Sequence, residues 1–326
     1  MKKEAVPASG PVTNDEIALQ LKKGKQRRIL MENIELWSFV IPAAIFIIIF
    51  HYVPLYGILI AFQDYFPGKP FLAFDGSTVW VGLKHIIKFT QSIYFGRIVG
   101  NTIRLSLLHL FISFWIPIIF ALILNEIKAL RFKKFIQTCS YLPYFISTVV
   151  VAAMFITFLE PTGILNRLLA VFGAKPKAWL DISTAYPWVY TLIQAWRSFG
   201  FSSVLYFSTL SAIDPTLYES ARIDGANRWS QMWHITLPGL KSIIMIQFIL
   251  AIGGILNSNT DLTLLIYSPA TYETSDVIGT YVYREGIESA KYSYSTAVSL
   301  FLSIIGFTLT TLANKLSNLL TGFGLW

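Results

Sequence analysis

The sequence predicts an all-α membrane protein, a polytopic bundle of six transmembrane helices. Of its 326 residues, 54% are hydrophobic and 13% are charged, about half the charged share of a typical soluble protein. A soluble domain of this length could not bury so much apolar surface, whereas a bilayer can solvate it. Windows of about 19 residues identify six apolar stretches that are long enough to cross the hydrocarbon core. They are residues 36–62, 98–124, 135–159, 186–211, 240–267 and 294–320.

Lysine and arginine residues are unevenly distributed among the polar segments. Seven of them lie in residues 1–33 and four in residues 125–134, whereas residues 268–293 contain four carboxylates and two basic residues. Cytoplasmic loops of membrane proteins retain basic residues. We therefore expect both termini, and the loops after the second and fourth spans, to be cytoplasmic. Residues 1–33 are expected to form a basic arm held by anionic lipid headgroups, and residues 34–326 one transmembrane domain.

The third loop contains an apolar run that is too short to cross a bilayer. Residues 164–172 are expected to form a short helix that lies at the membrane interface. Trp179 and Trp188 flank the following segment and are expected to anchor it, because indole rings favour the headgroup region.

The fourth loop is a polar segment between two apolar spans, and it carries the signals that begin and end helices. Asp214 can cap a helix that starts at Pro215 and runs to about residue 223. Gly225 can adopt the positive φ that ends such a helix. A second helix is expected over about residues 226–235.

Pro238 is expected to end this second helix and to turn the chain into the fifth span, because the residue before a proline disfavours helical backbone. Physical chemistry alone leaves two interpretations of the helix pair. It could be an amphipathic cap on the bundle, or it could be a contact site for another protein.

Motifs of several enzyme and binding classes are missing from the sequence. It has no G-x-x-x-x-G-K-[ST] phosphate loop, no G-x-S-x-G elbow and no H-E-x-x-H pair. Its single cysteine, Cys139, excludes a disulfide framework or a metal site with several cysteines. The basic residues do not alternate with aromatic ones as on a nucleic-acid-binding surface. The sequence therefore predicts a chain without catalytic activity, without a bound metal and without a nucleic-acid partner.

Eight positions of the fourth loop share their identity and spacing with a known family. The loop resembles the cytoplasmic EAA loop of binding-protein-dependent ABC importer permeases, from which it departs at Ser220 and Met232. The matching residues are Glu219, Ala221, Asp224, Gly225, Ala226, Ile235, Leu237 and Pro238.

Most of the chain after the first thirty residues is similar to one group within this family. The segments YVPLYGILIAFQDY, NTIRLSL and LANKLSNLLTGFGLW carry part of that similarity. The group comprises carbohydrate permeases that import complex and often acidic oligosaccharides, as in polygalacturonan- or alginate-type importers.

The resemblance implies a type I ABC importer permease fold in the inner or plasma membrane of a bacterium. It also implies four kinds of partner: a second similar permease, two cytoplasmic ABC ATPase subunits, an extracellular or periplasmic sugar-binding protein, and membrane lipid. The chain itself would bind no cofactor, since the ATPase subunits use the ATP and magnesium. The loop of residues 212–240 would couple the ATPases to the membrane helices. The implied coupling residues are Glu219, Ala221, Asp224, Gly225 and Pro238.

Polar and aromatic side chains within the fourth and fifth spans are candidates for a sugar-binding site. Polar groups could bond the sugar hydroxyls and aromatic rings could stack on the sugar faces, and Arg197 could bind a uronate carboxylate. Alternatively, Arg197 and Asp261 form a plain ion pair, or these groups make polar contacts between helices. The candidates are Tyr190, Gln194, Trp196, Arg197, Asn257 and Asp261.

The sequence also bears on three other functions. A self-contained secondary transporter or channel would need its own ion-coupling site, often within an inverted repeat, and no such repeat is evident. An intramembrane enzyme would need a nucleophile and a base deep in the spans, and none is found. An ABC permease for a solute other than a sugar remains within the same family.

Overall fold

The computed structural model describes residues 36–71, 78–256 and 259–325. Contacts within the chain divide it into two units, Met1–Leu59 and Ile60–Trp326, which are described separately. The predicted basic arm, residues 1–33, lies outside the described residues. In the first unit the chain is helical from residue 36, with a π-helical turn η1 (Ile48–Tyr52) followed by α2 (Val53–Leu55). Its large apolar side chains are mostly exposed.

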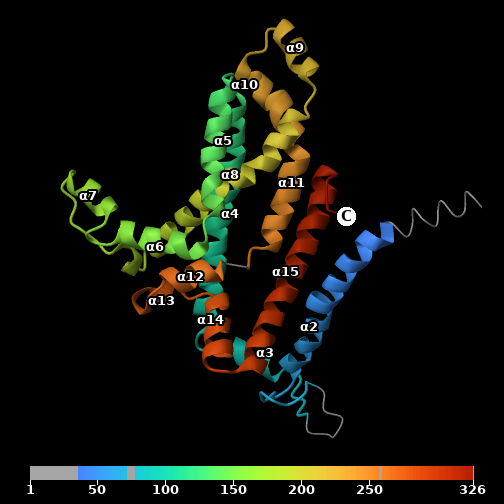
Figure 1. The fold of residues 1–326 in the computed structure, drawn as a ribbon, viewed down its shortest axis with the longest axis vertical. Coiled ribbons are helices and arrows are strands. Elements are labelled where there is room, and N and C mark those ends of the chain that lie inside the picture. Colours follow the sequence, from blue (N-terminus) through green and yellow to red (C-terminus); the bar gives the residue numbers. More distant parts are fainter. Residues whose placement is uncertain (1–35, 72–77, 257–258, 326) are drawn as a thin grey trace, which may run out of the picture. The chain divides into compact units, whose positions relative to one another are not determined.

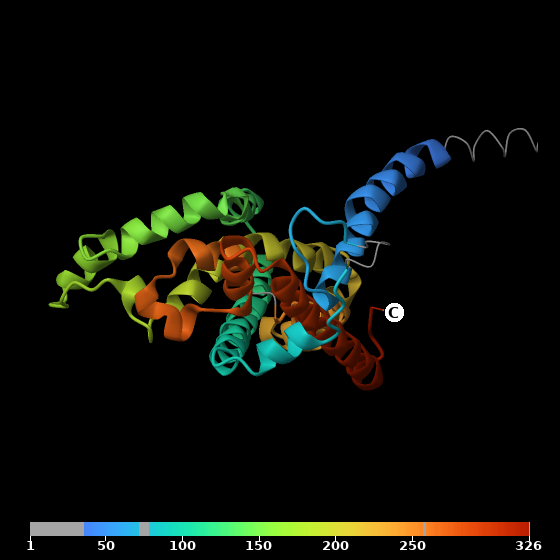
Figure 2. The same ribbon diagram turned by 90° about the horizontal axis from the view of Figure 1, so that it is seen from below.

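The second unit is a helical bundle, shown in two views in Figures 1 and 2. Apart from one isolated bridge between Gln63 and Trp80, the described residues contain no β-structure. Its main helices are α3 (Lys84–Thr90), α4 (Phe95–Asn125), α5 (Leu130–Phe145), α6 (Thr148–Leu159), α7 (Ile164–Ala170), α8 (Tyr186–Ser211), α9 (Pro215–Ile223), α10 (Arg228–Gln231), η4 (Met232–Thr236), α11 (Leu237–Gly253), α12 (Thr260–Ile266), α13 (Tyr272–Ser275), α14 (Ile278–Tyr283), η6 (Arg284–Glu288) and α15 (Tyr292–Thr321).

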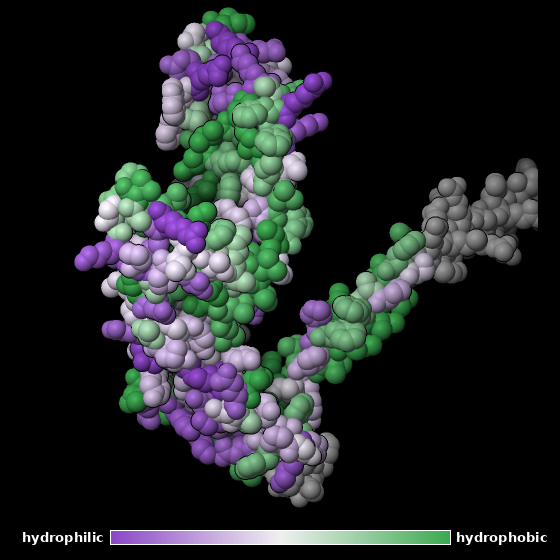
Figure 3. Space-filling view, turned by 60° about the vertical axis from the view of Figure 1, so that its left-hand side comes forward, coloured by the Kyte–Doolittle hydropathy of each residue, from purple (hydrophilic) through white to green (hydrophobic). Residues whose placement is uncertain are grey.

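Five helical segments of the described chain are long and apolar enough to cross a membrane. The predicted fourth span forms α8, which has 26 residues but is less apolar than the other five because it carries tyrosine, serine, glutamine and arginine. Hydrophilic side chains gather at the α9–α10 end and at the α3–α14 end of the face seen in Figure 3. The five segments that are long and apolar enough to cross a membrane are Leu36–Phe62, Phe95–Asn125, Thr148–Ala170, Arg228–Gly253 and Tyr292–Leu319.

Two of the predicted spans are not single helices. The span predicted at 135–159 is α5 followed by α6, because the backbone is extended at Ile146 and Ser147 and the Ser147 hydroxyl caps α6 by accepting the Val150 N–H. The span predicted at 240–267 is α11 followed by α12. The helix stops at Gly253 and Gly254, since glycine destabilises a helix interior.

Helix α4 runs the length of the bundle and takes part in each of its three apolar clusters. Near its middle, Leu105 packs with Tyr186 and Tyr190 of α8 and with Leu262 of α12. Towards its C-terminus it contributes to a second cluster with α8 and α11. Towards its N-terminus, Ile98 joins a third cluster with α3, α14 and α15. The packing of α4 on α8 therefore positions the elements that carry the functional side chains.

The crossing of α5 over α8 depends on Gly200, which is buried. A Cβ atom at this position would collide with the backbone oxygen of Ser140. We expect Gly200→Ala to force the two helices apart and to destabilise the fold by about 2 kcal/mol, the usual cost of overpacking. Gly100→Ala, on α4, is the matched control because its added Cβ would meet no atom within 4 Å beyond the adjoining backbone of its own helix. The first substitution should lower the midpoint of thermal unfolding in detergent, and the second should not. Equal midpoints of the two variants would contradict the predicted clash.

Candidate functional site

The loop after α8 begins with a capped helix, as the sequence predicts. The Asp214 side chain accepts a hydrogen bond from the Thr216 N–H at 2.9 Å, and Pro215 occupies the first turn of α9. Hydrogen bonds from the backbone and then the side chain of Thr216 lower the pKa of the Asp214 carboxyl. The carboxylate is therefore charged at neutral pH, where it also complements the helix dipole.

Helix α9 ends at a left-handed glycine, which the sequence also predicts. Gly225 has φ of +80°. Its N–H donates to the Arg222 carbonyl at 3.1 Å, and the Ala226 N–H donates to the Ala221 carbonyl at 2.8 Å. These two bonds form a Schellman motif. Within the predicted coupling set, Ala221 and Gly225 thus define the turn between the two helices.

The prediction that Pro238 ends the second helix is wrong. The chain stays helical from Arg228 to Gly253, a segment of 26 residues. The reason is the π-helical turn η4, in which the Leu237 N–H donates to the Met232 carbonyl five residues earlier. This wider turn accommodates the proline ring against the preceding turn, and the ring then lies in the first turn of α11.

Side-chain bonds hold the helix pair to itself and to the bundle. The Tyr218 hydroxyl lies 3.0 Å from the Thr236 hydroxyl and joins α9 to η4. The Gln231 amide donates to the Ala226 carbonyl at 2.8 Å. Arg228 lies 3.5 Å from the carboxylate of Glu126, at the end of α4. The loop is therefore an ordered structure with a defined connection to α4.

The exposed surface of the α9–α10 loop combines charged and apolar side chains. Glu219 and Asp224 are exposed, and so are Ile223 and Trp229, with exposed fractions of 87% and 70%. Exposed aromatic and aliphatic groups with charges around them are typical of a protein contact surface. In Figure 1 this surface lies at one extreme end of the bundle, at the tip formed by α9.

A cavity of about 700 Å³ lies among α4, α8 and α11. Of the predicted sugar-binding residues, Tyr190 and Gln194 line it. The Asn259 backbone N–H donates to the Tyr190 hydroxyl at 2.9 Å, and the Asn259 side-chain amide donates to Gln194 Oε1 at 3.1 Å. These bonds fix a polar patch where α8 meets the start of α12.

The other predicted sugar-binding residues that the structure describes do not line this cavity. Trp196 packs edge-on against Phe155, with ring centroids 5.4 Å apart, and Arg197 donates to the Thr148 hydroxyl at 2.9 Å. Asp261 is exposed in the first turn of α12 and makes no ion pair with Arg197. Asn257 lies outside the described residues.

Several polar residues of the cavity escaped the sequence analysis. His109 is among them, and its Nδ1 lies 3.0 Å from the Ser113 hydroxyl. The sequence did carry a signal for His109, because an ionisable residue inside a membrane span is uncommon. The Ser106 hydroxyl is buried without a hydrogen-bond partner in the described part of the chain. The residues missed are Ser106, His109, Ser113, Ser198, Ser202 and Gln247.

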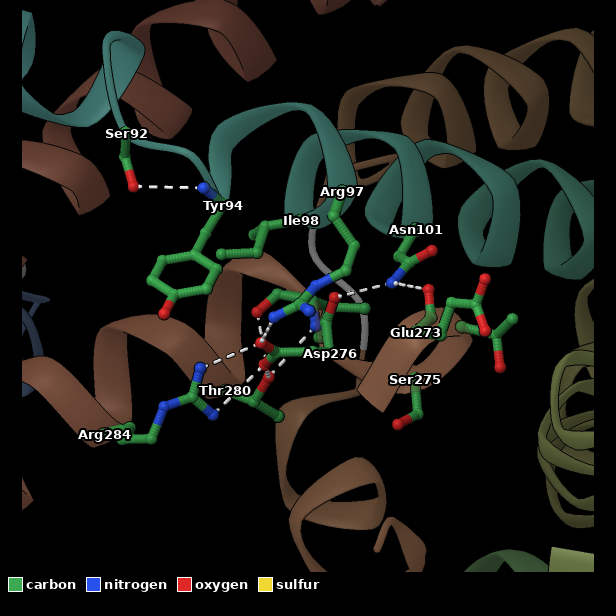
Figure 4. Close-up of polar contacts among 12 residues, drawn as sticks. Ser92, Tyr94, Arg97, Ile98, Asn101, Glu273, Ser275, Asp276, Thr280 and Arg284 are labelled. Carbon is green, nitrogen blue, oxygen red and sulfur yellow. Dashed lines mark hydrogen bonds and ion pairs between the residues drawn. The ribbon is translucent and has the colours of Figure 1, made fainter. Parts of the chain in front are cut away.

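A buried carboxylate at the opposite end of the bundle also escaped prediction (Figure 4). Asp276 is fully buried. It accepts two hydrogen bonds from Arg284, at 2.8 and 3.2 Å, and one from the Thr280 hydroxyl at 2.8 Å, while Arg97 approaches to 3.4 Å. The Asn101 amide donates to the backbone carbonyl of Asp276 at 3.1 Å. This cluster attaches the α13–α14 segment to α4.

One protein family matches most of the helical bundle. The sequence profile of the "Binding-protein-dependent transport system inner membrane component" family matches residues 118–321, which include the whole α9–α10 loop. The chain belongs to this family. It is therefore the membrane component of a binding-protein-dependent transport system, a multi-pass protein of the inner membrane.

Two relatives resemble the permease over most of their length, and both are from Bacillus subtilis (strain 168). The first is the polygalacturonan/rhamnogalacturonan transport system permease protein YteP, which is 41% identical over 92% of this chain and 94% of its own. The second is the protein LplB, which is 37% identical over 86% of this chain and 88% of its own.

Two crystal structures confirm the predicted permease fold. One is of a bacterial alginate ABC transporter in complex with an alginate pentasaccharide-bound periplasmic protein. A chain of it has a TM-score of 0.82 and 34% identity, covering 91% of the permease and 99% of that chain. The other is of a bacterial ABC transporter involved in the import of the acidic polysaccharide alginate. Its TM-score is 0.81 at 35% identity, with coverage of 93% and 99%.

Proposed function

We propose that this chain is a transmembrane subunit of an ATP-driven importer whose substrates are acidic, uronate-containing oligosaccharides. The observation that carries the proposal is the 41% identity, over nearly the whole chain, to a permease named for polygalacturonan and rhamnogalacturonan. The likeness to the alginate transporter structures supports the same substrate class. Both kinds of polysaccharide contain uronate units, so the shared chemistry is a carboxylate-bearing sugar.

The partners in this proposal are a second, similar permease, two cytoplasmic ATPase subunits, and an extracellular or periplasmic sugar-binding protein. Both termini and the α9–α10 loop face the cytoplasm, as the distribution of basic residues favours. The chain binds no cofactor, and the ATPase subunits bind and hydrolyse ATP with magnesium. The exposed Glu219 and Asp224, with the turn formed by Ala221 and Gly225, make the contact with an ATPase subunit.

The helix that follows the loop explains how movement of an ATPase subunit can reach the substrate. The continuous segment Arg228–Gly253 is about 39 Å long at 1.5 Å per residue. Its first turn belongs to the loop, and Gln247 and Ala251 near its other end line the cavity. A push on α10 is therefore transmitted along one helix to the cavity wall. Pro238 lies within this continuous helix and does not interrupt it.

The cavity supplies groups that suit a sugar. Its hydroxyl and amide groups can bond sugar hydroxyls, and its tyrosine and phenylalanine rings can pack on the faces of the sugar rings. When ATP draws the ATPase subunits together, the bundle opens outward and accepts the oligosaccharide from the binding protein. Hydrolysis then returns the bundle to the inward-facing arrangement.

We expect Gln194→Ala to weaken transport through loss of hydrogen bonds in the cavity. A single bond of this kind contributes about 1 kcal/mol, so uptake at limiting substrate should fall roughly fivefold. Gln137→Ala, on α5 outside the cavity, is the matched amide control. Uptake should be measured in proteoliposomes that hold the complete transporter. Equal uptake by the two variants would remove Gln194 from the substrate path.

The substrate class and the need for ATPase partners are tested in the same vesicles. The complete transporter, with its binding protein, should import trigalacturonate only when ATP is supplied, and the chain alone should import none. Gradient-driven flux through the isolated chain would favour a secondary transporter or channel. Uptake of a non-sugar solute, without uptake of trigalacturonate, would show an ABC permease of another specificity.

A further inference from the structure

A second cavity has a volume of about 750 Å³. The elements that line it lie at the end of the bundle opposite to α9 and α10, as the positions of α3 and α14 in Figure 1 show. Its walls come from α3, α14, η6 and the starts of α4 and α15. Volumes of this size are typical of small-ligand pockets. In the proposed orientation this end of the bundle faces outward, where a substrate would first meet the permease.

Two of the three lysines that line this cavity are already paired. Lys84 Nζ lies 2.6 Å from an oxygen of Asp64, and Lys291 Nζ lies 2.6 Å from an oxygen of Glu285. The hydrogen bond from Lys84 lowers the pKa of the Asp64 carboxyl, and the bond to Glu285 raises the pKa of the Lys291 ammonium. Asp64 and Lys291 are therefore charged at neutral pH, and each is held in an ion pair.

The third lysine, Lys88, is different. Within the part of the chain that the structure describes, no carboxylate lies within ion-pair distance of it. Its ammonium lies 5.4 Å from the ring centre of Tyr294, which also lines the cavity. The side chain is exposed. Lys88 thus brings to the cavity a positive charge that forms no ion pair in the described chain, beside the ring of Tyr294.

The buried Asp276 cluster adds positive charge behind the cavity wall. Arg97 and Arg284 share the one carboxylate of Asp276. The Arg97 guanidinium lies 5.2 Å from the ring centre of Tyr94, and that of Arg284 lies 5.7 Å from the ring centre of Tyr281. Both tyrosines line the cavity. Of the charged residues that line the cavity, three are lysines (Lys84, Lys88 and Lys291) and one is a carboxylate (Glu285), so the lining is positively charged.

We propose that this cavity is a binding site for the acidic oligosaccharide at the outer entrance of the permease. Lys88 binds a uronate carboxylate, the half-exposed ring of Tyr94 packs against a sugar face, and Gln91 bonds sugar hydroxyls. An excess of positive charge selects for an anionic ligand and speeds its approach. Aromatic rings beside an amide group favour a saccharide over a bare anion. The inference rests on the proposed function, because it takes its substrate class from there.

The test measures trigalacturonate binding to the full chain in nanodiscs of phosphatidylcholine, by saturation-transfer NMR. Lys88→Glu should weaken binding about tenfold, the usual effect of losing a charge-assisted hydrogen bond. Lys175→Glu, an exposed lysine in the loop after α7 and outside the cavity, is the matched control and should leave binding unchanged. The methyl ester of trigalacturonate, which lacks the charge, should bind weakly and equally to all three proteins.

The site is overturned if Lys88→Glu binds trigalacturonate as the unchanged chain does, or if the neutral ester binds as tightly as the acid. It is also overturned if Lys88→Glu alters only the retention of phosphatidylglycerol in mixed nanodiscs, or only the docking of the binding protein. These failures differ from failure of the proposed function. If the complete transporter imports trigalacturonate while Lys88→Glu changes nothing, the entrance site alone is wrong. If the complete transporter does not import trigalacturonate, the proposed substrate class is wrong.

Discussion

Gly225→Pro is expected to abolish most uptake while the chain still inserts into the membrane. Proline fixes φ near −65°, whereas Gly225 has φ of +80°, and it removes the N–H that donates to Arg222. The Schellman turn cannot form, at a local cost of about 3 kcal/mol, so α9 loses its orientation on α10. ATP hydrolysis by the complete transporter should then be uncoupled from uptake, which should fall by more than about tenfold. Uptake and ATPase rates in the same proteoliposomes check this.

The chain offers a closely matched control for this substitution. Gly173, in the loop after α7, also has φ of +80°, and its N–H donates to the Ala170 carbonyl at 2.9 Å. Gly173→Pro therefore disrupts the same kind of left-handed glycine turn, but away from α9. The ATPase subunits should still copurify with this variant. Glu219→Lys complements these two proline variants, because it reverses an exposed charge on α9 and leaves the backbone unchanged. Normal coupling in Gly225→Pro would contradict the role given to this loop.

Asp276→Asn is expected to be the most destabilising change at the end of the bundle that carries α3 and α14. Asparagine keeps the shape of the side chain but leaves Arg97 and Arg284 without their shared carboxylate. Removing one partner of a buried ion pair costs about 3–5 kcal/mol. We expect about 3 kcal/mol here, because both arginines are partly hydrated. The thermal unfolding midpoint of the purified chain should fall accordingly.

Glu285→Gln is the control for Asp276→Asn, since it removes a carboxylate from an ion pair whose lysine, Lys291, is exposed. Exposed ion pairs contribute about 0–1 kcal/mol, so this variant should unfold close to the unchanged chain. Equal effects of the two substitutions would mean that the Asp276 cluster does not attach α13 and α14 to α4.

The parts of the molecule that sequence analysis predicted well depend on local signals. Asp214, Pro215 and Gly225 act on their immediate neighbours, and the structure has the predicted helix start and helix end at these residues. Apolar stretches likewise identify most of the spans. Pro238 shows the limit of local rules, because a π-helical turn before it lets the helix continue.

Contacts between distant segments could not be derived in the same way. Arg97 and Asp276 are 179 residues apart, and Tyr190 and Asn259 are 69 apart, so neither pairing leaves a local pattern. Arg197 and Gln194 are close on the same helix, yet they make different contacts, because α6 packs beside one and the start of α12 beside the other. Of the residues predicted for a substrate site, the structure therefore has Tyr190 and Gln194 at the cavity and Trp196, Arg197 and Asp261 away from it.

The central claim is that an ATPase subunit binds the α9–α10 loop, and crosslinking from the α9 surface tests this claim most directly. The sequence has one cysteine, so Cys139→Ser gives a cysteine-free background. A photoactivated crosslinker on Ser220→Cys, at an exposed position beside Glu219, should capture an ATPase subunit, and the yield should change when ATP is added. The same reagent on Ser289→Cys, at the opposite end, should capture none. If a transport-active complex gives crosslinks from position 220 only to lipid, or to no protein at all, the account is contradicted.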